Sequence, residues 1–266
     1  MADYQFIVLE RRDLCTTVWL NRPERHNALH AGLILELQRS IDELSQDETV
    51  RTIVLAGRGT SFCAGGDLEW MQALATAPFE DNVQDARRLG YMLRTLSRCS
   101  KPTLARVHGP ALGGGLGLIA ACDLAIASRT AVFGATETRL GLTPSTVAPY
   151  VVAAIGERAA RRCFLTGERF DAVQAQRLGL IQEVADAQDL DQRVDAVLAA
   201  LALGGPQSQA HCKWLLHELR GRDPTSFNSQ ESLEESARSL ANVRAGEEAR
   251  EGIAAFFAHR KPSWAP

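Results

Sequence analysis

The sequence predicts an α/β fold made of repeated strand–turn–helix units, and three observations support this prediction. Short apolar or alternating runs, typical of strands, begin near residues 16, 52, 103 and 123. Turn residues follow each run and separate it from the next predicted helix or strand. Two of these turns are rich in glycine, and the chain beyond residue 206 shows helical patterns alone. Such units are typical of α/β layering, but their spacing leaves open whether the sheet is doubly wound or part of a superhelix.

Length and composition favour one large domain, or one domain with an appendage. The 266-residue chain has a mass of 28.9 kDa and is 45% hydrophobic, which is enough for a substantial core. Its 29 lysines and arginines are scattered and are offset by 32 aspartates and glutamates, so no nucleic-acid partner is expected. No apolar stretch has the length of a membrane span, and the first ten residues lack the pattern of a signal peptide. We therefore expect a cytoplasmic protein with no membrane partner.

The six cysteines lie far apart in the sequence and form no CxxC pair. No histidine stands at metal-ligand spacing from them. We therefore expect buried or incidental thiols in a reducing compartment, with neither disulfides nor a metal site.

Strands are predicted where short apolar or alternating runs end in turn residues. They cover residues 6–9, 16–20, 52–56, 103–108, 123–127, 131–134 and 181–185. Helices are predicted where apolar residues recur near a 3.6-residue period, as Leu33, Leu37 and Ile41 do. They cover residues 31–45, 83–99, 146–155, 156–167, 171–178 and 190–203, with further helices after each glycine-rich turn. Residues 76–81 are expected to form a loop.

The C-terminal part of the chain shows no strand pattern. Helices are predicted over residues 211–219, 230–243 and 247–259, and no low-complexity linker precedes them. We therefore divide the chain into a mixed core, residues 1–200, and a helical region, residues 201–266.

The two glycine-rich turns, residues 57–67 and 109–117, are the candidate binding elements. Each leads into a helix, where backbone N–H groups have no intrahelical acceptor and favour negative charge. Two such turns can direct two N–H groups at one oxygen, as an oxyanion formed from a thioester or carbonyl requires. Neither turn has the Lys-Ser/Thr ending or GxGxxG spacing of a nucleotide site, and no GxSxG elbow occurs. A close helix–strand contact would also explain glycines of this kind.

Several motifs occur in one register along nearly the whole chain. They are Asn21-Arg22-Pro23, Asn27-Ala28-Leu29, Phe62-Cys63-Ala64-Gly65-Gly66-Asp67-Leu68, the 109–117 cluster with Ala121-Cys122-Asp123, Phe133-Gly134 with Glu137 and Gly141, and Phe256-Phe257 with Lys261-Pro262 and Trp264. Together these motifs resemble the crotonase (enoyl-CoA hydratase/isomerase) superfamily.

The resemblance implies an α/β fold in the form of a crotonase-like spiral of ββα turns with a C-terminal helical trimerisation region. Residues 1–200 would be the core that binds coenzyme A and carries the catalytic groups. Residues 201–266 would assemble a homotrimer or a dimer of trimers. The substrate would be an acyl-CoA thioester, and no separate cofactor is implied because coenzyme A is part of the substrate.

The resemblance also assigns roles to residues. The thioester oxygen would accept hydrogen bonds from the N–H groups of Gly66 and Gly114. Coenzyme A would be bordered by Arg25, Ala28, Ala64, Gly65, Asp67, Leu68 and Lys261. Arg25 and Arg58 could bind phosphate, although solvated surface charges would explain them as well. Asp67 could equally be a helix cap.

Glu137 is the candidate catalytic base. It falls at one of the two glutamate positions of two-glutamate enoyl-CoA hydratases, and Gly117 occupies the other. One carboxylate can serve if water bound to Glu137 attacks C3 and the released proton reaches C2 through the same group. Gly117 would then leave room for a branch on C3, in a pocket that includes Leu118 and Tyr150. A structural ion pair with Arg139 is the alternative explanation of Glu137.

Further likeness narrows the substrate class. Residues 117–123, 143–152 and 156–162 resemble the bacterial branch that hydrates 3-substituted glutaconyl-CoA. This branch includes hydratases of 3-methylglutaconyl-CoA, from leucine breakdown, and of isohexenylglutaconyl-CoA, from acyclic-terpene breakdown; the likeness slightly favours the second. An enoyl-CoA isomerase is the main alternative, because it needs the same enolate site and one base. Non-catalytic acyl-CoA binding and RNA binding are less favoured.

Overall fold

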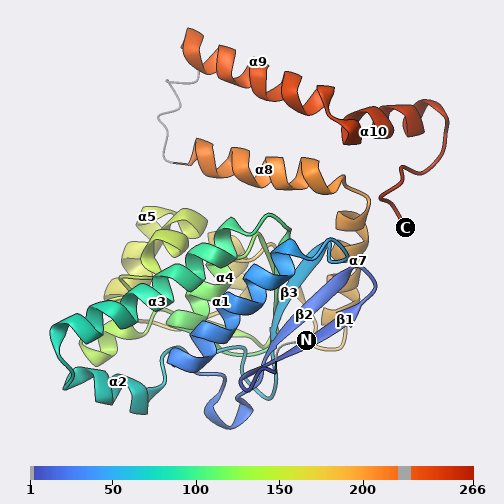
Figure 1. Ribbon diagram of the computed structural model, residues 1–266. Coiled ribbons are helices and arrows are strands. Elements are labelled where there is room, and N and C mark those ends of the chain that lie inside the picture. The colour runs from blue at the N-terminus through green and yellow to red at the C-terminus, as the bar shows by residue number, and fades with distance from the viewer. Residues whose placement is uncertain (1–2, 221–228) are drawn as a thin grey trace.

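Two sheets organise the body of the computed structural model, which describes residues 3–220 and 229–266 (Figure 1). The larger sheet has the order β1-β2-β3-β4-β6-β9, and the smaller has the order β5-β7-β8. The larger sheet contains β1 (Ile7–Arg12), β2 (Cys15–Leu20), β3 (Thr52–Gly57), β4 (Thr103–Val107), β6 (Leu124–Ser128) and β9 (Glu183–Ala185). The smaller sheet contains β5 (Ala111–Leu112), β7 (Val132–Gly134) and β8 (Phe170–Asp171).

The strand order selects between the two α/β arrangements that the sequence left open. β1 and β2 form an antiparallel hairpin, and each later strand of the larger sheet joins parallel to its neighbour. The strands are added in chain order toward one edge, whereas a doubly wound sheet changes direction at a switch point. β5 and β7 follow β4 and β6 in the chain but belong to the smaller sheet. Successive turns of the chain therefore supply both sheets, which confirms the α/β prediction and identifies a superhelix.

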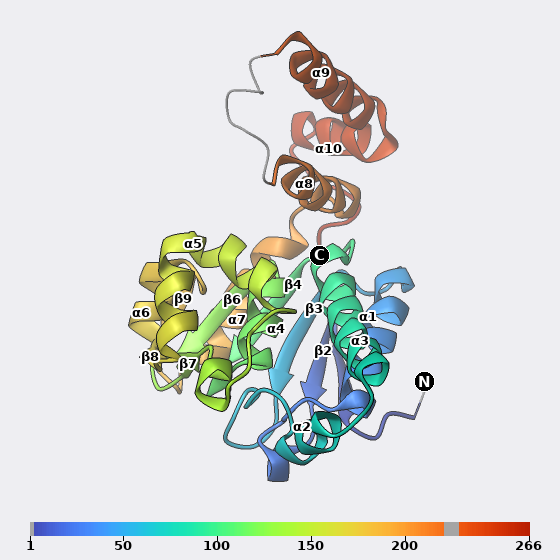
Figure 2. The same cartoon turned by 90° about the vertical axis from the view of Figure 1, so that its left-hand side faces the viewer.

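The helices cover both faces of the larger sheet (Figure 2). In the body they are α1 (Ala31–Gln46), α2 (Leu68–Ala75), α3 (Phe79–Arg98), α4 (Gly114–Ala121), α5 (Ala148–Thr166), α6 (Ala172–Leu178) and α7 (Leu190–Ala202), with the 3-10 turns η1 (Pro23–Arg25) and η2 (Glu137–Leu140). The C-terminal helices are α8 (Pro206–Leu219), α9 (Gln230–Ala245) and α10 (Glu247–Phe257).

Alternate residues of the central strands enter two separate cores. Ile53 and Leu55 of β3 pack in the core that contains Leu37 of α1. Val54, between them, packs in the core that contains Leu190 of α7. Because the strand is buried on both faces, its sequence is continuously apolar and shows no alternation.

One predicted loop is partly helical in the structure. Residues 76–81 were expected to form a loop, but α3 begins at Phe79. Glu80 and Asp81 lie in its first turn, where carboxylates are favourable, and the Asn82 side-chain amide donates to the carbonyl of Leu74 at 2.9 Å. The helix therefore begins in an acidic first turn, before the apolar periodicity becomes visible in the sequence.

The glycine at position 156 interrupts a helix as the sequence predicts. The helical segments on its two sides form α5, but Gly156 itself has φ of +75° and ψ of 157°. Two short strands, β5 and β8, were not predicted, because each has only two residues and neither forms a periodic pattern.

Helices α8, α9 and α10 stand away from the sheets (Figures 1 and 2). Large apolar side chains are exposed on them, namely Trp214, Leu216, Leu233, Leu240, Ile253, Phe256 and Phe257. At the base of this extension, Arg51 donates to the carbonyls of Gly204 and Trp264 at 2.6 and 3.3 Å. In the described part of the chain, no helix is both long enough and apolar enough to cross a bilayer. The use of this region for trimerisation stays a prediction.

Candidate active site

The two glycine-rich turns lie directly against each other. Cys63 and Ala111 form a parallel bridge, in which the Cys63 N–H donates to the Pro110 carbonyl and the Leu112 N–H donates to the Cys63 carbonyl, at 3.1 and 2.9 Å. A Cβ atom on Gly65 would lie 3.0 Å from the carbonyl oxygen of Leu112, and Gly65 has φ of +98°. Glycine is required here both by the close approach and by the backbone conformation.

Two backbone N–H groups have no hydrogen-bond acceptor among the described residues where these turns meet. The Leu29 N–H donates to the Gly65 carbonyl and the Asp67 N–H donates to the Leu29 carbonyl, at 2.7 and 2.8 Å, and this pairing does not use the N–H of Gly66 between them. Gly114 is the first residue of α4, and its N–H therefore has no intrahelical acceptor. A Cβ atom on Gly114 would lie 3.9 Å from the Cα of Gly65. The two donors expected for an oxyanion thus belong to adjoining turns.

The Glu137 carboxylate lies beside the second turn. Its Oε1 is 3.0 Å from the position that a Cβ atom on Gly113 would take, and Gly113 immediately precedes Gly114. Its Oε2 is buried and has no hydrogen-bond partner in the part of the chain that the structure describes. Burial raises the pKa of this carboxyl, and Arg139 is not among the causes of the shift. A buried, unpartnered carboxyl suits proton transfer better than a structural ion pair.

A cavity of about 650 Å³ is lined by both Gly66 and Glu137. The predicted residues that line it are Arg25, Ala28, Ala64, Gly65, Gly66, Asp67, Leu68 and Glu137. It is also lined by residues that the sequence did not single out for this site, among them Met71, Leu112, Gly113, Leu140 and Arg169. Most members of the predicted coenzyme and catalytic sets therefore share one cavity.

Five predicted residues do not line this cavity, and one of them is Gly114, which directly follows the lining residue Gly113. Lys261 lies in the C-terminal tail, where its Nζ donates to the Pro266 carbonyl at 2.5 Å. Tyr150 lines a second cavity of about 650 Å³, between α5 and α8. Leu118 is fully buried in the core, and Gly117 faces a neighbouring side chain.

The space beside Gly117 is filled by Val147. A Cβ atom at position 117 would lie 2.4 Å from Cγ1 and 2.7 Å from Cβ of Val147, which is 2% exposed. The interpretation of Gly117 as free room for an acyl branch therefore needs correction. This glycine permits a helix-to-segment contact, and Val147 takes the volume that a glutamate side chain would need.

The contact between Gly117 and Val147 predicts that alanine at position 117 destabilises the protein, whereas alanine in place of a helical glycine ordinarily stabilises it. Gly117→Ala should destabilise the protein by about 1–3 kcal/mol, because a β-branched side chain in a tight core cannot move aside cheaply. The matched control is Gly90→Ala in α3, where nothing lies within 4 Å of the added Cβ. That control should stabilise by about 0.5–1 kcal/mol. Urea unfolding of both variants checks this, and equal effects at the two positions would contradict the packing account.

The raised pKa of Glu137 predicts the acid side of the rate profile. If the carboxylate form is the base, the rise of kcat/KM with pH should follow Glu137 and lie above the range of an ordinary glutamate. Because the folded-state pKa is raised, the contribution of this group to stability is present below the unfolded pKa. It is lost as pH rises through the folded pKa. A pH profile of kcat/KM measures this rise on the acid side. The rise should be missing from the residual activity of Glu137→Gln.

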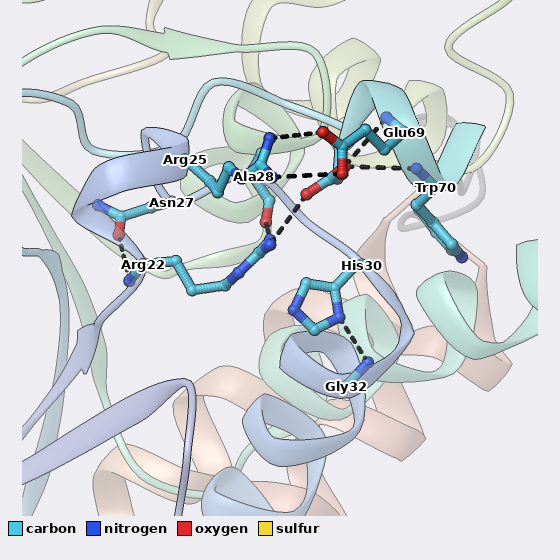
Figure 3. Close-up of polar contacts among 9 residues, drawn as sticks. Arg22, Arg25, Asn27, Ala28, His30, Gly32, Glu69 and Trp70 are labelled. Carbon is cyan, nitrogen blue, oxygen red and sulfur yellow. Dashed lines mark hydrogen bonds and ion pairs between the residues drawn. The ribbon is translucent and has the colours of Figure 1, made fainter. Parts of the chain in front are cut away.

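Asp67 organises the first loop through an ion pair and a helix cap. Its Oδ2 accepts from Arg22 at 2.9 Å, and its Oδ1 accepts from the N–H groups of Glu69 and Trp70 at the start of α2. Arg22 also donates to the Ala28 carbonyl at 2.6 Å, as Figure 3 shows. Burial alone would raise the pKa of Asp67, but Arg22 and the two N–H groups outweigh it and lower the pKa. This network fixes the loop that contains Ala28 against the loop that contains Gly66.

Loss of this network should destabilise the fold. Asp67→Ala removes a cap and leaves the Arg22 guanidinium, which is 13% exposed, without its carboxylate, at a cost of about 2–4 kcal/mol. Asp67→Asn keeps an oxygen that can cap α2 and should lose less. Because the folded pKa is lowered, the contribution of Asp67 is present above its unfolded pKa and disappears as pH falls through the folded pKa. Denaturant unfolding at neutral and acidic pH tests both points; equal stability of the three proteins would contradict them.

Arg25 and Arg58 are paired with carboxylates. Arg25 donates to Glu69 at 2.8 and 3.3 Å on the exposed rim of the cavity (Figure 3). Arg58 contacts Glu10 at 3.2 Å and lies 4.0 Å from the centroid of the Trp19 ring, away from the cavity. Of the two candidate phosphate contacts, the structure brings only Arg25 to the cavity.

Comparisons with known proteins identify the family of this chain. The model of the enoyl-CoA hydratase/isomerase family matches residues 11–266. The chain belongs to the enoyl-CoA hydratase/isomerase family. Enoyl-CoA hydratase ACTT6 of Alternaria alternata is 34% identical over 242 residues, which are 90% of this chain and 77% of the relative. Mevalonyl-coenzyme A hydratase sidH of Aspergillus fumigatus is 33% identical over 254 residues, which are 93% and 90% of the two chains.

The fold agrees with solved structures of the same family. The crystal structure of an enoyl-CoA hydratase from Shewanella pealeana superimposes with a TM-score of 0.93 at 37% identity, covering 98% of this chain and 96% of that one. This likeness confirms the crotonase fold predicted from the motifs. Family membership also confirms that the chain is an enzyme, and the names of its relatives support a hydro-lyase.

Proposed function

We propose that this member of the enoyl-CoA hydratase/isomerase family adds water across the C2=C3 bond of a 3-branched glutaconyl-CoA. The observation that carries the proposal is the Glu137 carboxylate, whose buried Oε2 has no hydrogen-bond partner among the described residues and which lies beside the two turns that contain Gly66 and Gly114. The motif likeness favours isohexenylglutaconyl-CoA, of acyclic-terpene breakdown, slightly over 3-methylglutaconyl-CoA, of leucine breakdown.

In the proposed mechanism the thioester oxygen accepts hydrogen bonds from the N–H groups of Gly66 and Gly114. Glu137 takes a proton from water as the water oxygen bonds to C3, and the C2=C3 electrons move into the enolate. The enolate then takes the proton from Glu137 at C2, which restores the carboxylate. Oxygen and hydrogen add on one face because a single group handles both, and a branched C3 supports the developing positive charge.

A relative supports a branched substrate. The protein named mevalonyl-coenzyme A hydratase, 33% identical to this chain, is named for an acyl group that has a methyl branch on C3. Because Val147 fills the space beside Gly117, the branch must lie in the Glu137 cavity itself. Leu68 and Leu140, which are 69% and 58% exposed on its rim, offer apolar contacts for it.

Substrate comparison tests the assignment. We expect kcat/KM for 3-methylglutaconyl-CoA or isohexenylglutaconyl-CoA to exceed that for crotonyl-CoA, with the faster glutaconyl ester indicating the pathway. A preference for crotonyl-CoA would overturn the branched-substrate proposal and leave the family activity in place.

The second candidate function is enoyl-CoA isomerisation. The same single carboxylate could move a proton between C2 and C4 of an enolate held by the two N–H groups. The relatives named as hydratases make this the weaker candidate. A shift of the double bond without incorporation of solvent oxygen would identify it.

We also propose that the C-terminal helices assemble a trimer or a dimer of trimers. The apolar residues of α9 and α10, Leu233, Leu240, Ile253 and Phe256, are exposed in the single chain, which supports burial against another copy. Lys261 would then reach coenzyme A in a neighbouring subunit rather than in its own. Light scattering coupled to size-exclusion chromatography gives the assembly mass directly, and a monomer would overturn this part of the proposal.

A further inference from the structure

Two arginines on the rim of the Glu137 cavity have no carboxylate partner. Arg139 and Arg169 both line the cavity, and neither guanidinium makes an ion pair or a side-chain hydrogen bond within residues 3–220 and 229–266. Of the other charged residues on the cavity, Arg25 pairs with Glu69 and Asp67 pairs with Arg22, whereas the Glu137 carboxylate has no ion-pair partner among the described residues. Glu24, also on the rim, lies on η1 beside Arg25. The side of the cavity formed by η2 and the segment before β8 therefore carries two guanidinium groups as well as the Glu137 carboxylate.

Arg139 is held by a contact that only glycine allows. A Cβ atom on Gly167 would lie 3.0 Å from Cγ and 3.2 Å from Nε of Arg139, and Gly167 has φ of +57°. The neighbouring Thr138 hydroxyl donates to the Phe164 carbonyl of α5 at 2.9 Å. The stem of Arg139 is thus packed and its turn is tethered, which lowers the entropy cost of binding an anion.

Arg169 lies next to an ordered strand. It directly precedes β8, whose Phe170 stacks on Phe133 of β7 with ring centroids 5.8 Å apart. The carboxylate of neighbouring Glu168 forms its ion pair with Arg162 of α5 and not with Arg169. Arg139 therefore lies on a tethered turn and Arg169 lies next to an ordered strand, and neither guanidinium is paired within the part of the chain that the structure describes.

Both cations line the cavity that contains Glu137, and the far end of a short dicarboxylic acyl group would lie in the same cavity. In a glutaconyl thioester the C5 carboxylate is two bonds from C3, the carbon at which Glu137 works in the proposed reaction. Arg139 lies two residues from Glu137 on the same 3-10 turn. A guanidinium group matches a carboxylate in both charge and planar geometry. A neutral acyl chain has no charged group that could form an ion pair with these two arginines.

We propose that Arg139 and Arg169 form an anion subsite that binds the terminal carboxylate of the acyl group. This inference deepens the proposed function and rests on it for the identity of the acyl group. The subsite would select dicarboxylic over monocarboxylic thioesters. Glu137 keeps its role as base, and the two arginines act on specificity alone.

Binding of saturated thioesters tests the subsite without requiring turnover. Calorimetry would compare glutaryl-CoA, which has a terminal carboxylate, with butyryl-CoA, which lacks one, on the full-length protein. We expect the pair of changes Arg139→Gln and Arg169→Gln to weaken glutaryl-CoA binding by about 10- to 100-fold, as loss of charge-assisted hydrogen bonds implies. Butyryl-CoA binding should change less than about 2-fold, because that ligand does not reach the subsite.

Matched variants separate the subsite from general charge and folding effects. Arg161→Gln is the control, because Arg161 is exposed on α5, pairs with Glu157 and does not line the cavity; it should change neither affinity. Arg139→Lys and Arg169→Lys keep the charge and should recover part of the glutaryl-CoA affinity. If the double variant fails to fold by circular dichroism, the two single glutamine variants carry the test, and each should show a selective loss.

Two outcomes would overturn the inference. Equal weakening of both thioesters would mean that the arginines bind a phosphate of coenzyme A, and no weakening of either would mean that they are surface charges. The proposed hydratase function fails separately, if the wild-type protein binds glutaryl-CoA selectively but hydrates no glutaconyl ester.

Discussion

Replacing Glu137 by glutamine is expected to lower kcat by about 10²- to 10⁴-fold, the range typical for loss of a positioned acid or base. Glutamine has almost the same shape as glutamate but cannot take a proton from water. Because Oε2 of Glu137 is buried with no partner among the described residues, the change should leave the free energy of unfolding equal or higher at neutral pH. Steady-state kinetics and urea unfolding of the same preparations measure the two effects.

The contrast between activity and stability separates catalysis from structure at this position. Glu137→Asp is a useful companion, because it keeps the charge and moves the carboxylate back by one methylene. It should recover little activity if positioning matters. A variant that loses stability while keeping most of its rate would show that Glu137 is a structural residue, and another base would then have to be sought in the cavity.

Replacing Gly114 by proline is expected to lower kcat by about 10²- to 10³-fold, the effect of removing one oxyanion donor. Gly114 is the first residue of α4, a position at which proline fits the helix and lacks only the N–H. The new side chain would also meet Leu29, whose Cδ1 would lie 2.6 Å from an added Cβ. Gly114→Ala makes the same contact but keeps the N–H, so it is the matched control.

The rate difference between these two variants isolates the hydrogen bond. We expect Gly114→Ala to retain most of the activity after Leu29 adjusts, while Gly114→Pro loses it at similar stability. Equal rates of the proline and alanine variants would show that the Gly114 N–H does not act on the thioester oxygen. Crystallography with a bound enolate analogue would then show which donor takes its place.

Much of the fold could be predicted because its strands and turns leave local signals. The continuous apolar run of β3 and the periodicity of α1 gave two elements within about two residues of their bounds, a usual margin for sequence reasoning. The start of α3 was missed because its first turn contains Glu80 and Asp81 and no apolar repeat, so the helical period becomes visible only further along the chain. The order of the strands in the sheet could not be predicted, because their spacing along the sequence does not indicate which strands pair with each other.

The candidate site was predictable where it depends on local backbone geometry. Gly66 and Gly114 stand in turns whose glycines can be recognised from the sequence, and Glu137 follows from a motif. The contact of Gly117 with Val147 joins positions 30 residues apart and leaves no sequence signal. The sequence suggested an ion pair between Arg139 and Glu137, but only the structure shows that the Arg139 charge is unpaired among the described residues.

Product analysis in H₂¹⁸O tests the central claim most directly. The enzyme would be incubated with 3-methylglutaconyl-CoA, isohexenylglutaconyl-CoA and a 3-enoyl-CoA, and the products would be examined by mass spectrometry. The account predicts ¹⁸O in a tertiary alcohol from a glutaconyl ester, with the label lost in Glu137→Gln. A shifted double bond without label would contradict it and identify an isomerase that uses the same single carboxylate.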